Sequence, residues 1–361
     1  MEDLFSRSVK KDWEKIATHE TQEKNPFEIL SWRGKDGILY LPYYDSEDTA
    51  ALHFLNSFQI AAADAGPRSW GNLPAIKVTD EVNANTLALN HLSFGVDGIL
   101  FDVRKQHPTD CTRLLHDIEW PHCFLAFKVK QDAFVDSLAE FIKSKFDPES
   151  LRGTLFWETI PKINTVDFYL QHCKNARCIG LIIAETSPAE EICDALLKGA
   201  HTVETFRTAA AIPTIFSHLA FSLPVDASLV ETMSKLKALR MLWYQVAQAY
   251  GNNDYKLSDL HIHAYSARVA DDAYGPHENM LKGTFAAIGA IAGGCDSLSV
   301  ESDAQPPFVA RQARNISAIL QEESFFGQVA DPIAGSYAVD AITNAIAAKA
   351  WSMFQEKWHA L

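Results

Sequence analysis

The chain has 361 residues, of which 47% are hydrophobic and 22% are charged, as in an ordinary globular protein. Lys+Arg 32 against Asp+Glu 46 gives a net charge of −14, and no stretch gathers the basic residues, which argues against nucleic acid and anionic membranes as partners. The polar N-terminus lacks a signal-peptide core and no stretch is apolar enough to cross a membrane, so we expect a cytoplasmic protein.

Residues 1–70 are predicted to form an N-terminal arm and linker. Within them, WRGKDGILYLPYY (32–44) has the pattern of a β-hairpin whose turn is Asp36-Gly37. The arm carries several large apolar side chains: Trp13, Phe27, Ile29, Trp32, Tyr43 and Tyr44. It either wraps around a partner chain or folds back over its own barrel, and the sequence leaves both alternatives open.

Residues 71–361 are predicted to form an α/β fold, a (β/α)8 TIM barrel. Short apolar runs have the character of strands that are buried on both faces. They lie at 74–80, 96–102, 123–129, 153–159, 179–185, 215–223, 260–266 and 296–302. Helical patterns separate many of them, at 83–94, 133–145, 188–199 and 228–250. This alternation favours a closed barrel over an open sheet, although the run 215–223 fits a helix equally well.

Two predictions concern helix ends. Ser228 and Glu231 have the spacing of a capping box at the start of the helix at 228–250. Before the last helical pattern, Asp331-Pro332 is predicted to set a turn, Gly335 to allow a close approach of the chain, and Ser336 to cap the final helix.

In a (β/α)8 barrel the functional side chains lie at the carboxyl ends of the strands. Here those ends carry Asp80, Asp102, Glu185, Tyr265, Ser266 and Glu301. Asp102 and Glu185 fit a paired acid and base, but acidic residues at such positions more often cap the next helix or face water. Neither interpretation is decided by the sequence.

Two histidines, His261 and His263, alternate on one predicted strand and therefore point to the same face. They either begin a metal site, for which a third ligand is not evident, or line the interior through hydrogen bonds, which the pattern favours. No P-loop, GxGxxG or GxSxG motif supports nucleotide binding or serine hydrolysis. An aldolase-type barrel would need a buried lysine or a metal cluster at a strand end, and neither is found.

Four segments carry a resemblance to a known family. ARNISAILQEESFFGQVADPIAGSYAVDAI (313–342) resembles the segment that closes the substrate barrel of methylmalonyl-CoA mutases, and KLKALRMLW (235–243) resembles their K-L-R-A-x-R-x-L-W helix. ENMLKGTFAAIGAIAGGCDSL (278–298) resembles their N-M-L-R-A-T…GG-x-D-x-L element, in a form typical of the small subunit. The arm at 12–44 is similar to the arm of that subunit. The resemblance reaches from residue 12 to 358 and is most specific in the C-terminal third.

The resemblance implies a barrel that, in catalytic members, threads the CoA tail of the substrate along its axis. Those members rearrange methylmalonyl-CoA and succinyl-CoA through radicals that start from adenosylcobalamin on a separate domain. This sequence departs from them at the catalytic histidine, whose position falls near Ile182, and at PRSWGNLP (67–74), which lacks their tyrosine. In FSHLAF (216–221), His218 and Ala220 replace their phosphate-binding Arg and Ser.

A cobalamin domain is not expected, since the chain ends at Leu361, and the D-x-H-x-x-A pattern at 259–264 is expected to be chance. The resemblance therefore implies a small (beta), non-catalytic subunit, with no catalytic residue, no metal site and no cofactor of its own. Its partner would be a large (alpha) catalytic subunit, and the complex would hold adenosylcobalamin. A homodimer of the isolated chain is also allowed.

The alternative is a divergent acyl-CoA mutase barrel that works with a cobalamin-binding domain on a separate polypeptide. The candidate residues at the barrel mouth or facing the acyl-CoA are then Glu185, His218, His263, Tyr265, Ser266, Asn279, Lys282 and Glu301. Of these, His263, Asn279 and Lys282 fall on positions that match family motifs, with Lys282 in place of an arginine.

Overall fold

The computed structural model describes residues 9–22, 25–52, 54, 66–104, 109–266, 276–301 and 307–360. The strands are β1 Trp32–Arg33, β2 Leu39–Tyr40, β3 Gly71–Asn72, β4 Ala75–Lys77, β5 Gly98–Asp102, β6 Phe124–Val129, β7 Arg152–Trp157, β8 Ala176–Ile182, β9 Leu219–Val225, β10 His261–Ser266 and β11 Ser297–Ser299. The helices are α1 Lys10–Thr21, α2 Pro26–Leu30, α3 Ser46–Thr49, α5 Glu81–Ser93, α6 Cys111–Leu114, α7 Asp132–Lys145, α8 Ile163–His172, α9 Pro188–Phe206, α10 Ile212–His218, α11 Leu229–Ala249, α12 Pro276–Gly293, α13 Pro307–Glu322 and α14 Tyr337–His359.

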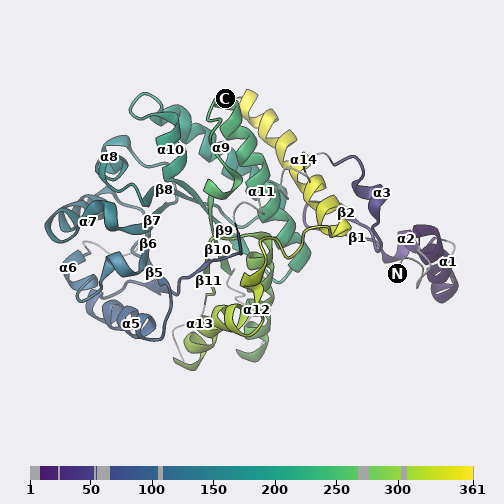
Figure 1. Ribbon diagram of the computed structural model, residues 1–361, viewed down its shortest axis with the longest axis horizontal. Helices are drawn as coiled ribbons and strands as arrows, with labels where there is room; N and C mark the ends of the chain where they lie inside the picture. The colour runs from purple at the N-terminus through teal and green to yellow at the C-terminus, as the bar shows by residue number, and fades with distance from the viewer. Residues whose placement is uncertain are drawn as a thin grey trace.

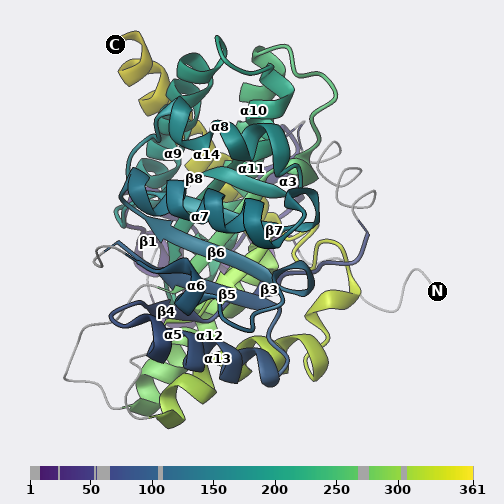
Figure 2. The ribbon, with the colours of Figure 1, turned by 90° about the vertical axis from the view of Figure 1, so that its left-hand side faces the viewer.

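The parallel strands close into a barrel, surrounded by helices (Figure 1, Figure 2). β3 and β4 are two halves of one strand, separated only by Leu73-Pro74. The first half pairs with β11, where Leu73 N donates to Leu298 O at 2.8 Å. The second half pairs with β5, where Leu100 N donates to Pro74 O at 3.0 Å. Because this strand has a neighbour on each side, the sheet has no free edge, and the predicted TIM-barrel fold is confirmed.

The outward faces of the strands are covered by tightly packed helices. Trp243 on α11 is fully buried, and its ring centroid lies 5.0 Å from that of Phe221 on β9. Gly199 on α9 faces the same indole, because a Cβ there would lie only 2.5 Å from it. A glycine at this position lets α9 approach α11 closely enough to seal the core.

Several local predictions are confirmed or corrected. The run 215–223 divides, since α10 ends at His218 and β9 begins at Leu219. The Ser228 capping box is wrong, because the Ser228 side chain makes no cap hydrogen bond while the Glu231 carboxylate accepts one from Tyr40. Ser336 caps α14, as predicted. Gly335 has open space where a Cβ would lie and a φ of +80°, so it serves the turn's left-handed backbone and not a close approach.

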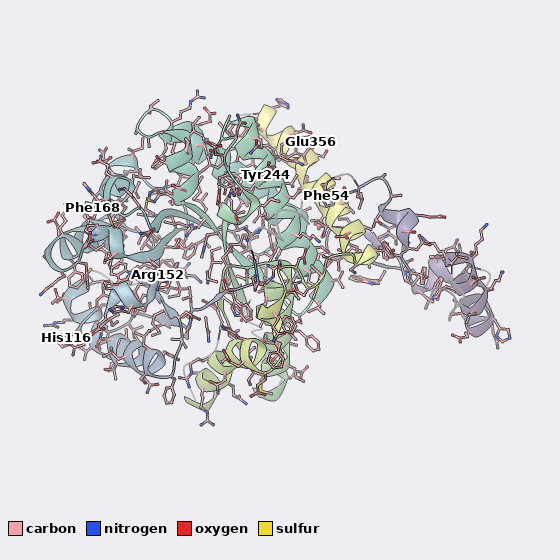
Figure 3. All side chains as sticks on the ribbon, in the orientation of Figure 1. Phe54, His116, Arg152, Phe168, Tyr244 and Glu356 are labelled. Carbon is pink, nitrogen blue, oxygen red and sulfur yellow. The ribbon has the colours of Figure 1, made fainter. Side chains whose placement is uncertain are left out.

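The residues before the barrel form α1, α2, the β1–β2 hairpin and α3. α1 and α2 project away from the ring of strands (Figure 1), and Phe54 lies where this region meets α14 (Figure 3). The antiparallel hairpin pairs Trp32 with Tyr40, and Gly37 has a φ of +72°, which confirms the predicted turn. The hairpin rests on the chain's own barrel, while the first two helices extend beyond it.

Two contacts from the turn of the hairpin help to hold it in place. Lys35 pairs with Asp226 at 2.7 Å, beyond the carboxyl end of β9. Asp36 Oδ2 accepts a hydrogen bond of 3.0 Å from Ala189 N in the first turn of α9. The exposed backbone N–H groups of a helix start favour such a carboxylate, so the hairpin also serves as a cap for α9.

Candidate functional site at the barrel mouth

The centre of the barrel is filled by apolar side chains. Alternate residues of each strand point inward, and the central layer has no solvent exposure. It consists of Leu73, Leu100, Ala126, Phe156 and Ala220. Gly180 on β8 provides the space for the Phe156 ring, because a Cβ there would lie 2.5 Å from the ring's Cδ1. The axis is therefore packed in the manner of a protein core.

His263 on β10 crosses the interior beside this layer. Its Nδ1 lies 2.8 Å from Ser222 Oγ, its Nε2 lies 3.0 Å from Ser299 Oγ, and its ring centroid lies 5.0 Å from that of Phe156. Burial holds the pKa of His263 well below its usual range, and the neighbouring Lys128 charge adds to this effect. The side chain is a neutral, hydrogen-bonded part of the core.

His261 lies one layer nearer the amino end of the strand. Its Nε2 is 2.9 Å from Ser297 Oγ, and its ring stacks on Phe124 at 5.7 Å between centroids. Burial, followed by the nearby Arg177 charge, lowers the pKa of His261 to about 3. The preferred interpretation of the His261/His263 pair as a hydrogen-bonded lining is confirmed, and no group of three possible metal ligands occurs among the described residues.

Charged side chains meet above this core, at the carboxyl ends of the strands. Arg104 donates to both carboxylate oxygens of Asp102, at 2.8 and 2.7 Å, and to Glu158 at 2.7 Å. Burial opposes ionisation of Asp102, but the hydrogen bonds from Arg104 outweigh it and hold the pKa of Asp102 below its usual value. Asp102 is thus an ionised partner of Arg104 rather than a proton donor.

Lys128 on β6 lies in the same mouth. Its Nζ is 4.4 Å from the ring centroid of Tyr265 and 3.9 Å from Glu301 Oε1. The Tyr265 hydroxyl donates to Ile183 O at 3.1 Å, which fixes the ring in place. Burial lowers the pKa of Lys128, and the Glu301 carboxylate offsets only part of that effect. The mouth therefore contains a buried amine with weak stabilisation of its charged form.

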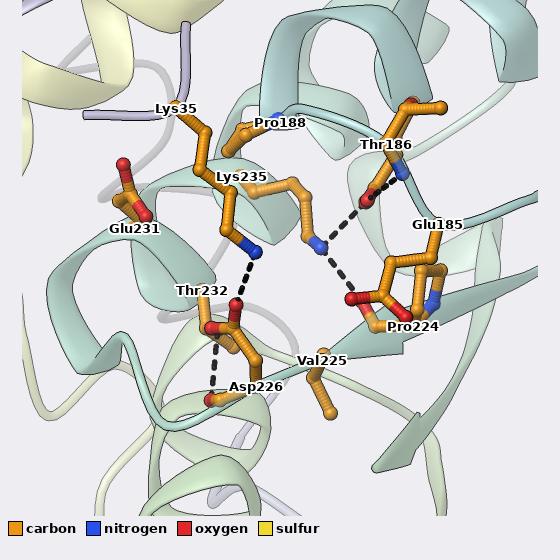
Figure 4. Close-up of a pocket in the computed structure, with 11 residues that line it drawn as sticks. Lys35, Glu185, Thr186, Pro188, Pro224, Val225, Asp226, Glu231, Thr232 and Lys235 are labelled. Atoms are coloured by element: carbon orange, nitrogen blue, oxygen red, sulfur yellow. Dashed lines mark hydrogen bonds and ion pairs between the residues drawn. The ribbon is translucent and has the colours of Figure 1, made fainter. Parts of the chain in front are cut away.

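A second polar site lies beside the mouth, under the arm hairpin (Figure 4). This small pocket is lined by Lys35, Glu185, Thr186, Pro188, Glu191, Pro224, Val225, Asp226, Glu231, Thr232 and Lys235. Lys235 Nζ donates to Glu191 Oε2 and to Pro224 O, each at 2.6 Å. Burial raises the pKa of Glu191 even with Lys235 beside it. The charges in the pocket are engaged mostly with one another.

The predicted site residues fall into separate places. Tyr265, Ser266 and Glu301 share the mouth, where Glu301 N donates to Ser266 Oγ at 2.8 Å. His263 lies beneath them in the core, and Glu185 lines the hairpin pocket. His218 does not lie at the mouth, because it ends α10 before β9 begins; it is buried with Nδ1 3.6 Å from Cys178 Sγ.

Two further candidates lie on α12. Lys282 is half-buried there, and Asn279 belongs to the same helix, with its side chain outside the described residues. The acidic strand ends divide as well: Asp80 caps α5 through Asn83 N, and Asp102 pairs with Arg104. The alternative in which strand-end acids cap the next helix or face water is thus correct for Asp80, which caps α5, and for Glu185, which is exposed.

Comparison with known proteins now identifies the family. The family model described as methylmalonyl-CoA mutase matches residues 156–357, more than half of the chain. The chain belongs to the methylmalonyl-CoA mutase family. The match runs from β7 through α14 and so includes the mouth residues on β10 and the whole C-terminal closure of the barrel.

Individual relatives agree with this assignment. The methylmalonyl-CoA mutase small subunit of Porphyromonas gingivalis is 28% identical over 371 residues, covering 91% of this chain and 59% of the relative. That of Streptomyces virginiae is 33% identical over 179 residues, covering 48% of this chain and 29% of the relative. A methylmalonyl-CoA mutase of Rhizobium meliloti is 30% identical, with 55% and 27% covered. The chain spans less than two thirds of the length of these relatives.

The K-L-K-A-L-R segment of α11, which resembles a family motif, has a structural explanation. Three charged side chains of α11 are turned toward the protein and each holds a different element. Lys235 pairs with Glu191 of α9, and Lys237 pairs with Asp340 of α14 at 3.0 Å. Arg240 donates to Asp296 at 2.7 Å and to the backbone carbonyl of Gly294, before β11. These three contacts tie α11 to α9, to α14 and to the segment before β11.

Lys128 is the functional candidate that the sequence analysis missed. We expected no buried lysine at a strand end, and the structure corrects this, since the Lys128 side chain is only 7% exposed. A signal was present: in CFLAFKV, Phe124 and Ala126 point inward, so the alternation places Lys128 on the inner face as well.

No helix in the described parts of the chain is long and apolar enough to cross a membrane.

Proposed function

We propose that the chain is a small (beta), non-catalytic subunit of a methylmalonyl-CoA mutase-like isomerase, and that it stabilises a large catalytic chain. The observation that carries this proposal is the packed barrel axis. Catalytic members thread a CoA tail along that axis, whereas here Leu73, Leu100 and Phe156 meet there with 0% exposure. Two of the relatives compared above are themselves named small subunits.

The chemistry of the mouth supports the same proposal. Ile182, near which the position of the family's catalytic histidine falls, points inward and packs against the central layer. An alkane side chain donates no hydrogen bond to a rearranging acyl group. His218, which replaces a phosphate-binding arginine, is buried against Cys178. Burial lowers the pKa of His218 to about 4, so it supplies no positive charge for a phosphate near neutral pH.

The described residues do not fit cobalamin. His261 is the histidine of the D-x-H-x-x-A pattern at 259–264, and a cobalt ligand would have to extend from a loop. Instead, His261 lies within β10 and its Nε2 is engaged with Ser297 Oγ. We therefore place adenosylcobalamin, if the complex uses it, on the partner chain and derive no step from it.

The proposed partner is the long catalytic mutase chain of the same organism. α1 and α2 extend from the barrel and expose Ile16 and Ile29 by 61% and 51%, which supports an intermolecular contact through the arm. The test mixes the two purified chains with adenosylcobalamin and measures complex mass by light scattering together with mutase turnover. We expect a stable heterodimer, and no turnover by this chain alone. No complex at micromolar concentrations would contradict the proposal.

A second candidate function has one observation in its favour. Tyr265, Ser266 and Glu301 lie together at the mouth beside Lys128, as they would in a divergent acyl-CoA mutase barrel that works with a separate cobalamin-binding chain. Turnover of methylmalonyl-CoA by this chain with a separately supplied cobalamin protein, in the absence of the long chain, would support this function and refute the subunit role.

A further inference from the structure

The surroundings of Lys128 differ from those of a structural lysine. Buried lysines elsewhere in the chain have close acceptors: Lys235 has two at 2.6 Å, and Lys237 has a carboxylate at 3.0 Å. Within the described parts of the chain, Lys128 Nζ has no hydrogen-bond acceptor, and its nearest carboxylate, Glu301, is 3.9 Å away. Its other neighbour is the face of the Tyr265 ring, at 4.4 Å.

Charges of both signs act on the same amine. The Arg104 guanidinium lies in the mouth with its donors directed to Asp102 and Glu158, and its charge and that of Lys77 both act against protonation of Lys128. His263 lies below as a neutral group. Glu301 and, less strongly, Asp102 favour the charged form, but burial has the larger effect. A desolvated amine beside other cations is the environment that makes a lysine nucleophilic. Burial lowers the pKa of Lys128 accordingly.

We propose that Lys128 is a reactive amine that condenses with small aldehydes at the barrel mouth to form an imine. This activity is independent of the subunit role, because it requires only this chain. The neutral Nζ attacks the carbonyl carbon, so an N–C bond forms and the carbonyl electron pair moves to oxygen. A first proton passes from nitrogen to that oxygen and gives the neutral carbinolamine. A second proton then passes from nitrogen to oxygen, the C–O bond breaks, water leaves, and the C=N double bond of the imine forms.

We assign the transfer of protons between nitrogen, oxygen and solvent to Glu301. Its carboxylate is the nearest basic group to Nζ and is 30% exposed, so it can exchange protons with solvent as the carbinolamine forms and loses water. The reaction needs no oxidant or reductant: an amine and an aldehyde give an imine and one water. The bound carbonyl compound would lie above the Tyr265 ring.

The position of Lys128 sets the size and charge of the aldehyde. The core below Lys128 is closed and its side chain is only 7% exposed, so we expect only small molecules to reach Nζ. Lys77, Lys128 and Arg104 are balanced there by Asp102, Glu158 and Glu301. This balance favours an uncharged aliphatic aldehyde.

The test is reductive trapping on the full chain. The protein is incubated with acetaldehyde and sodium cyanoborohydride from pH 6 to 9, and the extent of modification at each lysine is followed by peptide mass mapping. We expect Lys128 to react more than about tenfold faster than the exposed Lys145 at pH 7. Equal or slower labelling of Lys128, or none, would overturn the proposal.

A matched variant separates reactivity from mere access. In Glu301→Gln the carboxylate that favours the ammonium is lost, so the pH at which Lys128 labelling reaches half its maximal rate should fall, while Lys145 labelling should not change. The far-ultraviolet spectrum of the variant confirms that it is folded. An unchanged pH profile at Lys128 would show that Glu301 does not control the amine and would refute the proposed pair.

Discussion

Lys237 Nζ lies 3.0 Å from Asp340 Oδ1 and 3.4 Å from Asp331 Oδ2, and all three side chains are buried. This cluster joins the KLKALR segment of α11 to the DPIAGSY turn and to α14. The two segments that carry the strongest resemblance to the family therefore meet in a single ion cluster. Their chemistry closes the barrel and leaves the mouth to other residues.

The first prediction follows from that cluster. Lys237→Met leaves the buried Asp340 carboxylate without its Lys237 partner and leaves Asp331 with the more distant Arg68, at 4.0 Å. We therefore expect a loss of about 3–5 kcal/mol in the free energy of unfolding, measured by urea denaturation. Lys143→Met removes an exposed lysine that pairs with Glu140 and should cost less than about 0.5 kcal/mol. A loss below about 1 kcal/mol for Lys237→Met would contradict the prediction.

The second prediction concerns two glycines of the hairpin. A Cβ on Gly34 would collide with the Glu231 carboxylate and the Tyr40 ring, whereas a Cβ on Gly37 would meet only open space. Gly34→Ala should therefore displace the hairpin and break the Tyr40–Glu231 hydrogen bond. Gly37→Ala, at a φ of +72°, should cost only about 1 kcal/mol of local strain.

Hydrogen exchange measured on a peptide spanning residues 32–40 distinguishes the two variants. We expect Gly34→Ala to lose protection across the hairpin and Gly37→Ala to retain most of it. Equal protection in both variants would mean that the hairpin is not held by its contact with α11.

The barrel could be predicted from the sequence, because strands that are buried on both faces appear as continuous apolar runs. Few folds other than a (β/α)8 barrel have eight such strands alternating with helices. The His261/His263 pair was likewise assigned to the interior from spacing alone. The capping-box prediction is wrong because a residue distant in the sequence binds one of its two members. Ser228 offers a hydroxyl at the correct spacing, but Tyr40, which is 191 positions away from Glu231, captures the carboxylate that the capping box needs.

The candidate site was harder to predict than the fold. Lys128 lies in a strand whose other residues are apolar and mostly buried. Its position beside Tyr265 and Glu301 depends on the register of the strands, which the sequence does not give. Tyr265 and Glu301 were found because they end strands. His218 was misplaced because the sequence does not reveal that α10 continues to residue 218, before β9 begins.

The third prediction is a pH dependence. Burial lowers the pKa of His218 to about 4 and that of His261 to about 3, and it holds the pKa of His263 well below the usual value of 6.5. The unfolded chain therefore binds more protons than the folded chain below pH 6.5. Stability is complete above that pH and is lost as the pH falls toward the folded values, by about 1.4 kcal/mol per pH unit for each histidine.

Urea midpoints at intervals between pH 7.5 and 4.5 measure this slope. His261→Gln should reduce it by about one histidine's share, 1.4 kcal/mol per pH unit. His116→Gln, at an exposed position, should leave it unchanged. A slope that is the same in wild type and His261→Gln would show that His261 accepts its proton as easily in the folded chain as in the unfolded chain.

The last prediction tests the packed axis. Phe156 is fully buried, its ring lies against Gly180, and its centroid is 5.0 Å from that of His263. Phe156→Ala should leave a cavity and cost about 3–5 kcal/mol, while Phe168→Ala on the surface of α8 should cost less than half as much. Urea denaturation of both variants measures the difference.

The same variant separates a closed axis from an open one. Leu73 and Leu100 remain in the central layer after Phe156→Ala, so neither the wild type nor the variant should bind CoA in equilibrium dialysis at millimolar ligand. CoA binding by the wild type would mean that the ligand reaches the barrel by another route. Binding by the variant alone would mean that one phenyl ring blocks the axis. Absence of binding in both is the result expected of a barrel whose entire central layer has become core.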